Sequence, residues 1–163
     1  MIVQDGSPDS QEWPDLKYIF FVGTAGSGKS TLVGAFKQWL DDEGVDSIVV
    51  NLDPGADALP YGPDVDIREW INLEETMREY GLGPNGAQIV AADLMAANIS
   101  KMSQVIETYG SEYVLVDTPG QLELFAFRES SQLIVSAFGA EDSMIVYLSD
   151  HSLCRTPNGF ISA

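Results

Sequence analysis

The 163-residue sequence has few basic residues and a single cysteine. Eight lysines and arginines stand against 25 aspartates and glutamates, which gives a formal net charge of −17. A chain of this charge repels nucleic-acid backbones and anionic membranes, so we expect neither as a direct partner. Cys154 can form no internal disulfide, which favours a reducing compartment. No apolar run approaches the length of a membrane span and no secretory signal is present, so we predict a soluble, cytoplasmic protein.

The acidic residues are spread along the whole chain and do not form a tail. We interpret them as a solvated surface typical of proteins from a high-salt, halophilic cytoplasm, where ions screen most of the self-repulsion. The alternative is an ordinary acidic protein. Residues 1–15 contain two prolines and little periodicity, so we expect a flexible leader there. Residues 16–163 are long enough and apolar enough for one globular domain.

The strongest motif spans residues 23–30, which fit the pattern Gly-x-x-x-x-Gly-Lys-Ser/Thr at every fixed position. The apolar run 18–22 predicts a buried strand before it, and the spacing of apolar residues in 31–40 predicts a helix after it. In this context, backbone N–H groups converge on an anion at the helix N-terminus. We therefore predict a nucleotide phosphate site, with Lys29 reaching the outer phosphates and Ser30 ligating Mg²⁺. The residues predicted to bind phosphate are Gly26, Ser27, Gly28, Lys29, Ser30 and Thr31.

Two further apolar runs, 47–52 and 113–117, predict buried strands that end in acidic residues. Ligands bind at the carboxyl ends of such strands in open parallel sheets. We interpret Asp117 as the carboxylate on the Mg²⁺ side, with an acidic loop residue as the alternative. Asp53 is a candidate to accept a proton from water, to hold a metal-bound water, or only to form a turn. Gln121 is a candidate to position an attacking water.

The remaining chain alternates helices and strands. The expected elements are a mobile loop over 56–65, a helix from its cap at Asp66 to Tyr80, a turn over 81–86, a helix over about 87–109, a helix containing 133–138 and a strand over 144–148. Parallel strands need helical crossovers of this length. The sequence therefore predicts an α/β fold of the P-loop NTPase type, with a mostly parallel sheet covered by helices on both faces.

Several of these motifs together resemble the GPN-loop GTPases, especially their archaeal members. The segments that carry the resemblance are 24–30, 52–54, Asp66, the triplet Gly83-Pro84-Asn85, and 117–125. The resemblance implies a homodimeric, Mg²⁺-dependent GTPase that binds GTP and GDP. In this family the Gly-Pro-Asn loop of one subunit enters the active site of the other and contacts the phosphates. Eukaryotic members are associated with RNA polymerase assembly, so a protein client of an assembly role is a further expectation.

The resemblance also assigns roles to individual positions in this sequence. It implies catalytic roles for Asp53, Gln121, Glu123 and Asn85; metal-side roles for Ser30, Asp53 and Asp117; and nucleotide contacts for Gly83, Pro84, Asn85 and Gly120.

Two departures from related patterns bear on specificity. Thr24 stands where the signature-lysine ATPases carry an extra lysine, which argues against that branch. No Thr-Lys-x-Asp or Asn-Lys-x-Asp motif for guanine occurs, and the family places this motif after a further helix. We therefore expect that the sequence stops before the motif, and the guanine preference follows from the resemblance alone.

Three hypotheses remain open at this stage. The first is a dimeric GTP hydrolase that switches shape through the loop 56–65. The second is a small-molecule kinase in which Asp53 activates a substrate hydroxyl. The third is a fragment that binds nucleotide or partners without turnover. The Gly83-Pro84-Asn85 triplet favours the first hypothesis over the second, because a kinase has no evident use for it.

Overall fold

The computed structural model describes residues 18–121, 129–151, 153–155 and 158. The leader expected over residues 1–15 lies outside the described residues, and so does Glu123.

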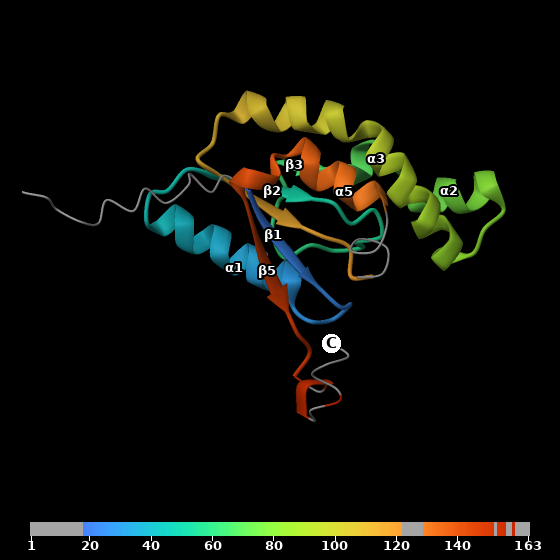
Figure 1. Ribbon diagram of the computed structural model, residues 1–163, viewed down its shortest axis with the longest axis horizontal. Coiled ribbons are helices and arrows are strands. Elements are labelled where there is room, and N and C mark those ends of the chain that lie inside the picture. Colours follow the sequence, from blue (N-terminus) through green and yellow to red (C-terminus); the bar gives the residue numbers. More distant parts are fainter. Residues whose placement is uncertain (1–17, 122–128, 152, 156–157, 159–163) are drawn as a thin grey trace, which may run out of the picture.

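A five-stranded sheet forms the centre of the molecule (Figure 1). Its strands are β1 (Tyr18–Gly23), β2 (Ser47–Asn51), β3 (Val65–Asp66), β4 (Tyr113–Asp117) and β5 (Ser143–Leu148). They lie in the order β3-β2-β4-β1-β5, and every pairing between neighbours is parallel. All residues of β1 and β2 are buried, as their continuous apolar runs predict for strands covered on both faces. The predicted α/β class is confirmed.

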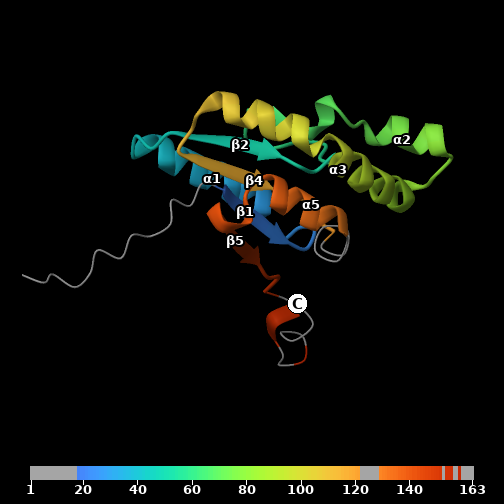
Figure 2. The same cartoon turned by 45° about the horizontal axis from the view of Figure 1, so that its top comes forward.

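Helices cover both faces of this sheet. They are α1 (Lys29–Asp42), α2 (Leu73–Tyr80), α3 (Pro84–Tyr109) and α5 (Glu129–Ala137), with short 3₁₀ turns at η1 (Ile67–Glu69), η2 (Ala140–Asp142) and η3 (Leu153–Arg155). Helix α1 packs Val33 and Leu40 with Phe21 on one face. Helices α3 and α5 pack Met95 and Ile134 against the other, and Figure 2 shows them together on that side. No helix in the described ranges is both long enough and apolar enough to cross a bilayer.

Three predicted boundaries need correction. The chain after the loop 56–64 forms the short strand β3, because Val65 pairs in register with Val50 of β2. The Asp66 side chain caps only the 3₁₀ turn η1, where it accepts from the Arg68 N–H. Helix α2 starts later, at Leu73, where the Asn72 side chain supplies the cap.

Helix α3 begins earlier than predicted, at Pro84, so the expected turn 81–86 is shorter. Proline breaks a helix interior but suits its first position, because its fixed φ is already helical and its missing N–H would have no partner there.

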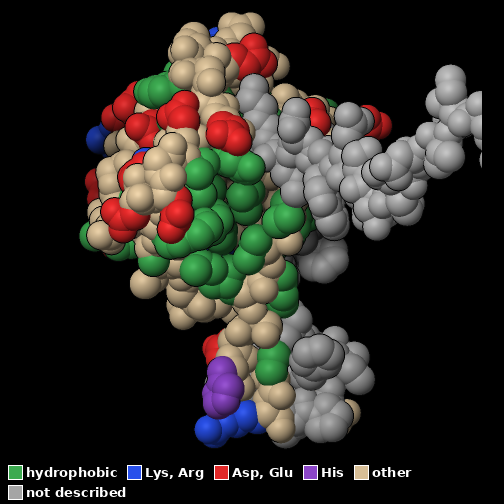
Figure 3. Space-filling view, turned by 90° about the vertical axis from the view of Figure 1, so that its left-hand side faces the viewer, with side chains coloured by type: hydrophobic (Ala, Val, Ile, Leu, Met, Phe, Trp, Pro, Cys, Tyr) green, Lys and Arg blue, Asp and Glu red, His purple; other side chains and the backbone are tan. Residues whose placement is uncertain are grey.

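Acidic side chains are distributed over the surface. Figure 3 shows acidic side chains over the upper part of one face and a continuous area of hydrophobic side chains below them. Adaptation to high salt stays a prediction from this charge.

Candidate functional site

The predicted site residues from three strands meet at the carboxyl edge of the sheet. Strand β4 lies between β1 and β2 and places Asp117 opposite Phe21 on one side and Asn51 on the other. The phosphate loop leaves the end of β1, and Asp53 follows the end of β2. The structure therefore brings the loop, Asp53 and Asp117 together, as expected for parallel strands that end at one edge.

The phosphate loop leaves the N-terminus of α1 uncapped by side chains. Gly28 is the N-cap with φ of 94°, a left-handed conformation that favours glycine, and no side chain caps the first turn. A Cβ on Gly23 would lie 2.4 Å from the Leu148 carbonyl oxygen, so this position also requires glycine. The free N–H groups of the first turn are suited to an anion.

The Lys29 side chain folds back on its own loop and is 6% exposed. Its Nζ donates to the carbonyl oxygens of Gly23 and Thr24, each at 3.0 Å. Burial lowers the pKa of Lys29, while the carboxylates of Asp117 and Asp53 act in the opposite direction. The ammonium is therefore close to both acids and available to an incoming phosphate.

Two hydroxyl groups of the same loop have no partner. Thr24 Oγ1 and Ser27 Oγ are buried, and neither forms a hydrogen bond with any described residue. Buried polar atoms are normally paired, so an orphaned pair within a glycine-rich loop fits a site that a ligand completes. This supports the predicted role of Ser27.

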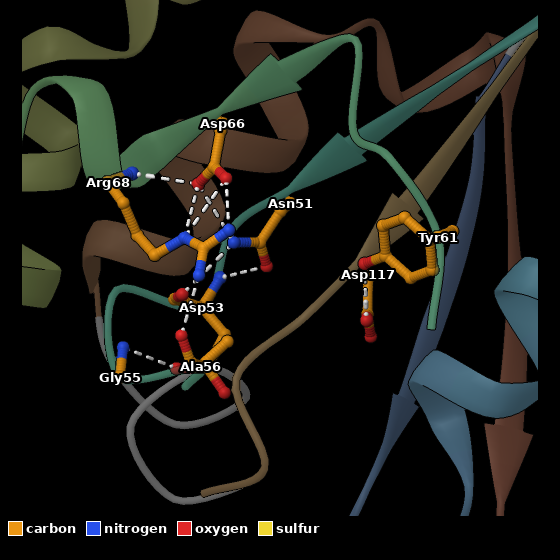
Figure 4. Close-up of polar contacts among 8 residues, drawn as sticks. All are labelled: Asn51, Asp53, Gly55, Ala56, Tyr61, Asp66, Arg68 and Asp117. Carbon is orange, nitrogen blue, oxygen red and sulfur yellow. Dashed lines mark hydrogen bonds and ion pairs between the residues drawn. The ribbon is translucent and has the colours of Figure 1, made fainter. Parts of the chain in front are cut away.

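Asp117 is only 1% exposed, and its two oxygens differ. Oδ2 accepts a hydrogen bond of 2.6 Å from the Tyr61 hydroxyl (Figure 4), whereas Oδ1 is buried without a partner among the described residues. Burial, reinforced by the Asp117 carboxylate, raises the pKa of Tyr61. Sequence analysis missed Tyr61, because it lies in a loop without periodicity, 56 residues before its partner.

The donors at this edge fit a magnesium ion that arrives with a nucleotide. Mg²⁺ in such sites takes one or two carboxylates, a hydroxyl, phosphate oxygens and water. Ser30, Asp53 and Asp117 are the predicted protein contribution, and Oδ1 of Asp117, which has no partner among the described residues, would accept from a metal-bound water. The described residues contain no group of three or more histidine, cysteine or acidic side chains that could hold a metal alone.

Asp53 combines a turn with a position near the other charges. Its Oδ1 accepts from the Gly55 N–H at 2.9 Å, so the turn considered as an alternative does form. Burial raises the pKa of Asp53; the Gly55 N–H and Lys29 oppose this, and Asp117 adds to it. The balance leaves the pKa above its ordinary value, which suits a group that exchanges a proton.

A third acidic residue, Asp66, is held by one arginine and by amide groups (Figure 4). Arg68 Nε lies 3.0 Å from each Asp66 oxygen, and Asn51 Nδ2 donates to Asp66 Oδ1 at 3.0 Å. Burial would raise the pKa of Asp66, but the hydrogen bonds from Arg68 and Asn51 outweigh it and lower that pKa. Arg68 also donates to the Ala56 carbonyl at 2.8 Å. Arg68 therefore joins Asp66 to the loop that follows β2.

The segment after β4 packs against the phosphate loop. A Cβ on Gly120 would lie 2.8 Å from Ala25 Cα, so only glycine permits this approach. The Gly120 N–H also acts to lower the pKa of Asp53, which places it beside that acid. Gln121 follows as a half-buried residue. The catalytic roles of Gln121 and Glu123 stay predictions.

The Gly-Pro-Asn triplet lies at the corner between α2 and α3. Gly83 is the N-cap of α3, and Pro84 and Asn85 form its first turn, which corrects the expectation of a loop. All three are exposed, and both views place this corner to the side of the sheet, apart from the phosphate loop. One turn further, Gln88 Nε2 would lie 3.4 Å from a Cβ on Gly55, so α3 contacts the loop after Asp53.

Comparisons with known proteins agree with this geometry. Residues 21–163 match the family described as "conserved hypothetical ATP binding protein". The chain is 41% identical over 144 residues to the GPN-loop GTPase PAB0955 of Pyrococcus abyssi, covering 87% of this chain and 56% of that protein. It is 37% identical to the GPN-loop GTPase QQT2 of Arabidopsis thaliana over 144 residues, covering 86% and 38% respectively.

A solved structure gives the same result. The crystal structure of PAB0955 from Pyrococcus abyssi, described as a GTPase in apo form, superimposes with a TM-score of 0.80 at 38% identity. The match covers 91% of this chain and 59% of that one, so the chain spans little more than half the length of this relative. The sequence similarity, the shared fold and the phosphate-loop geometry lead to one conclusion: the chain belongs to the GPN-loop GTPase family.

Proposed function

We propose that this protein binds GTP and GDP together with Mg²⁺ and hydrolyses GTP. The observation that carries the proposal is the carboxyl edge itself, where an uncapped helix N-terminus, Lys29 and an unpartnered Asp117 oxygen lie together. The names of the relatives favour GTP, whereas the family description mentions ATP.

The residues at the edge divide the chemistry among them. On nucleotide binding, Lys29 exchanges its two carbonyl partners for phosphate oxygens, which develop negative charge in the transition state. Ser30 and Asp117 would hold Mg²⁺, which would supply positive charge to the phosphates. Asp53, whose pKa is raised, orients the attacking water and accepts its proton, while Gln121 aligns that water.

The proposal includes a homodimer in which Asn85 serves the site of its partner. Asn85 is exposed at the α2–α3 corner, where a second subunit can approach it. Its amide can donate to phosphate oxygens or to water. Arg68, which lies near the site, is already committed to Asp66 and Ala56 and cannot serve as the charge-stabilising finger without breaking these bonds. A role in assembly with a protein client, such as RNA polymerase, extends this proposal on the resemblance alone.

Phosphate release from Mg²⁺-GTP by mixed variants tests the proposal. We expect Lys29→Ala to lose binding and turnover, and Asn85→Ala to bind but not hydrolyse. A mixture of the two should regain part of the activity, because a heterodimer contains one site with Lys29 from one chain and Asn85 from the other. A mixture as inactive as its components, despite proven subunit exchange, would contradict the in-trans role. Nucleotide binding by the wild type without any phosphate release would contradict hydrolysis and favour the kinase or the non-hydrolysing hypothesis.

A further inference from the structure

We propose that Tyr61 is a positioning residue of the magnesium-nucleotide site, which it serves by orienting Asp117; this inference rests on the proposed function. The Tyr61 hydroxyl donates to Asp117 Oδ2, and this leaves Oδ1 as the oxygen that would accept from a metal-bound water. The following three observations support this division between the two oxygens.

The first observation is the hydrogen bond itself. The Tyr61 oxygen lies 2.6 Å from Asp117 Oδ2, a short distance that is typical of a hydroxyl donating to an ionised carboxylate. Because the carboxyl group is planar, fixing Oδ2 also fixes the direction of Oδ1. Oδ1 has no partner among the described residues although it is buried. Oδ2 is therefore held by a hydrogen bond within the protein, and Oδ1 is free to accept from a ligand.

The second observation is that packing and neighbouring hydrogen bonds hold the Tyr61 ring in place. A Cβ on Gly34 of α1 would lie 3.6 Å from both Cβ and Cδ1 of Tyr61, so the ring packs directly on that helix. Tyr61 also packs against the apolar cluster under α1. Further along the loop, the Asp64 N–H donates to the Val49 carbonyl and the Asp64 carboxylate accepts from the Val49 N–H, each at 2.8 Å. These contacts fix the ring relative to the sheet.

The third observation is the burial of Asp117, which is 1% exposed. An ionised carboxylate in such a place needs partners that compensate for lost water. Among the described residues, Tyr61 is the side chain that donates to Asp117, and a bound metal would complete the compensation. The same bond joins the loop 56–64 to the metal site, so occupancy of the site and the conformation of this loop are coupled.

The test uses Tyr61→Phe, which keeps the ring and removes only the hydroxyl. The measured quantity is the ratio of the GDP dissociation constant in EDTA to that in saturating Mg²⁺, which reports how much the metal strengthens binding. A merely structural residue shifts both constants equally and leaves the ratio unchanged. We expect Tyr61→Phe to lower the ratio about tenfold or more, the effect of one hydrogen bond to a charged group.

Tyr109→Phe is the matched control. The Tyr109 hydroxyl donates to the Asp64 carbonyl at 2.9 Å, so this variant also removes one tyrosine hydrogen bond from the same loop, without touching Asp117. Its ratio should equal that of the wild type. In an Asp117→Asn background, Tyr61→Phe should have little further effect on the ratio, because the two residues act as one unit.

The outcomes separate the inference from the proposed function. An unchanged ratio in Tyr61→Phe, or an equal fall in Tyr109→Phe, overturns the inference and leaves nucleotide binding intact. A higher ratio shows that Tyr61 competes with the metal and also overturns it. A wild-type protein that binds no GDP in either condition overturns the proposed function, and the inference with it.

Discussion

Asp53 and Asp66 occupy two adjoining regions of the molecule and show opposite behaviour. Both follow or end a strand at the same edge, and Asn51 contacts both (Figure 4). Asp66 lies in a braced region, where Arg68 and Asn51 outweigh the effect of burial and lower its pKa. Asp53 lies in the phosphate-loop region beside Asp117 and Lys29, where burial raises its pKa.

The difference shows what an arginine partner does to a buried acid. An acid with such a partner and two or more hydrogen bonds is a structural element, and its charge is already neutralised. An acid whose pKa is raised, beside a second acid and a lysine, has a charge that the protein compensates only in part. A bound ligand or a proton can supply the missing compensation. The following variants test this distinction, beginning with the largest expected effect.

Asp53→Asn should slow GTP hydrolysis by about a hundredfold or more, since it removes a proton acceptor. It should also raise the free energy of unfolding of the empty protein at pH 7. The raised pKa means that the ionised form is less favourable in the folded state than in the unfolded one, so removal of the charge stabilises the fold. Phosphate release and thermal melting measure the two effects. Unchanged hydrolysis would show that Asp53 only forms the turn with Gly55.

Arg68→Ala should lower the free energy of unfolding by about 2 kcal/mol, because Asp66 loses its ion pair and the Ala56 carbonyl loses a donor. Arg78→Ala is the matched control. Arg78 lies 4.0 Å from Glu75 and its side chain is 81% exposed, so its loss should cost less than about 0.5 kcal/mol. Chemical denaturation measures both variants. Equal losses would show that the braced region contributes no more than a surface ion pair.

Asp66→Asn should change how the free energy of unfolding depends on pH, and this effect should be smaller than that of Arg68→Ala. The pKa of Asp66 is lower in the folded protein than its ordinary 3.8, so this carboxylate stabilises the fold above that pH. The stabilisation is lost as the pH falls through the folded pKa. The wild type should therefore lose stability more steeply below about pH 4 than Asp66→Asn does. Denaturation series from pH 5 to pH 3 measure the free energy of unfolding of both proteins. If it falls with the same slope in the two, this would be evidence against the pairing of Asp66 with Arg68.

The residues that the structure brings together as predicted are those whose signal is local. The phosphate loop is defined by spacing within eight positions, and Asp117 by the apolar run that it ends. The start of α3 was misplaced because the same proline that ends a helix can begin one, and only the neighbouring chain decides between these.

The residues that were missed depend on contacts between distant parts of the chain. Tyr61 meets Asp117 across 56 positions, and strand β3 exists because Val65 pairs with Val50. Asp66 was expected to cap a long helix, but its pairing with Arg68 and Asn51 gives it another role. No periodicity in the loop 56–64 predicts these contacts, because they form only once the sheet has assembled.

We expect the phosphate-loop region at the carboxyl edge to bind nucleotide phosphates through Lys29. Thermal melting of the wild type and of Lys29→Ala, each with and without Mg²⁺-GDP, tests it most directly. Comparing each protein with its own empty form removes the effect of the two carbonyl bonds that Lys29 makes without ligand. The account predicts a clear rise in melting temperature for the wild type and none for Lys29→Ala. An equal rise in both proteins, or no rise in either, would contradict it.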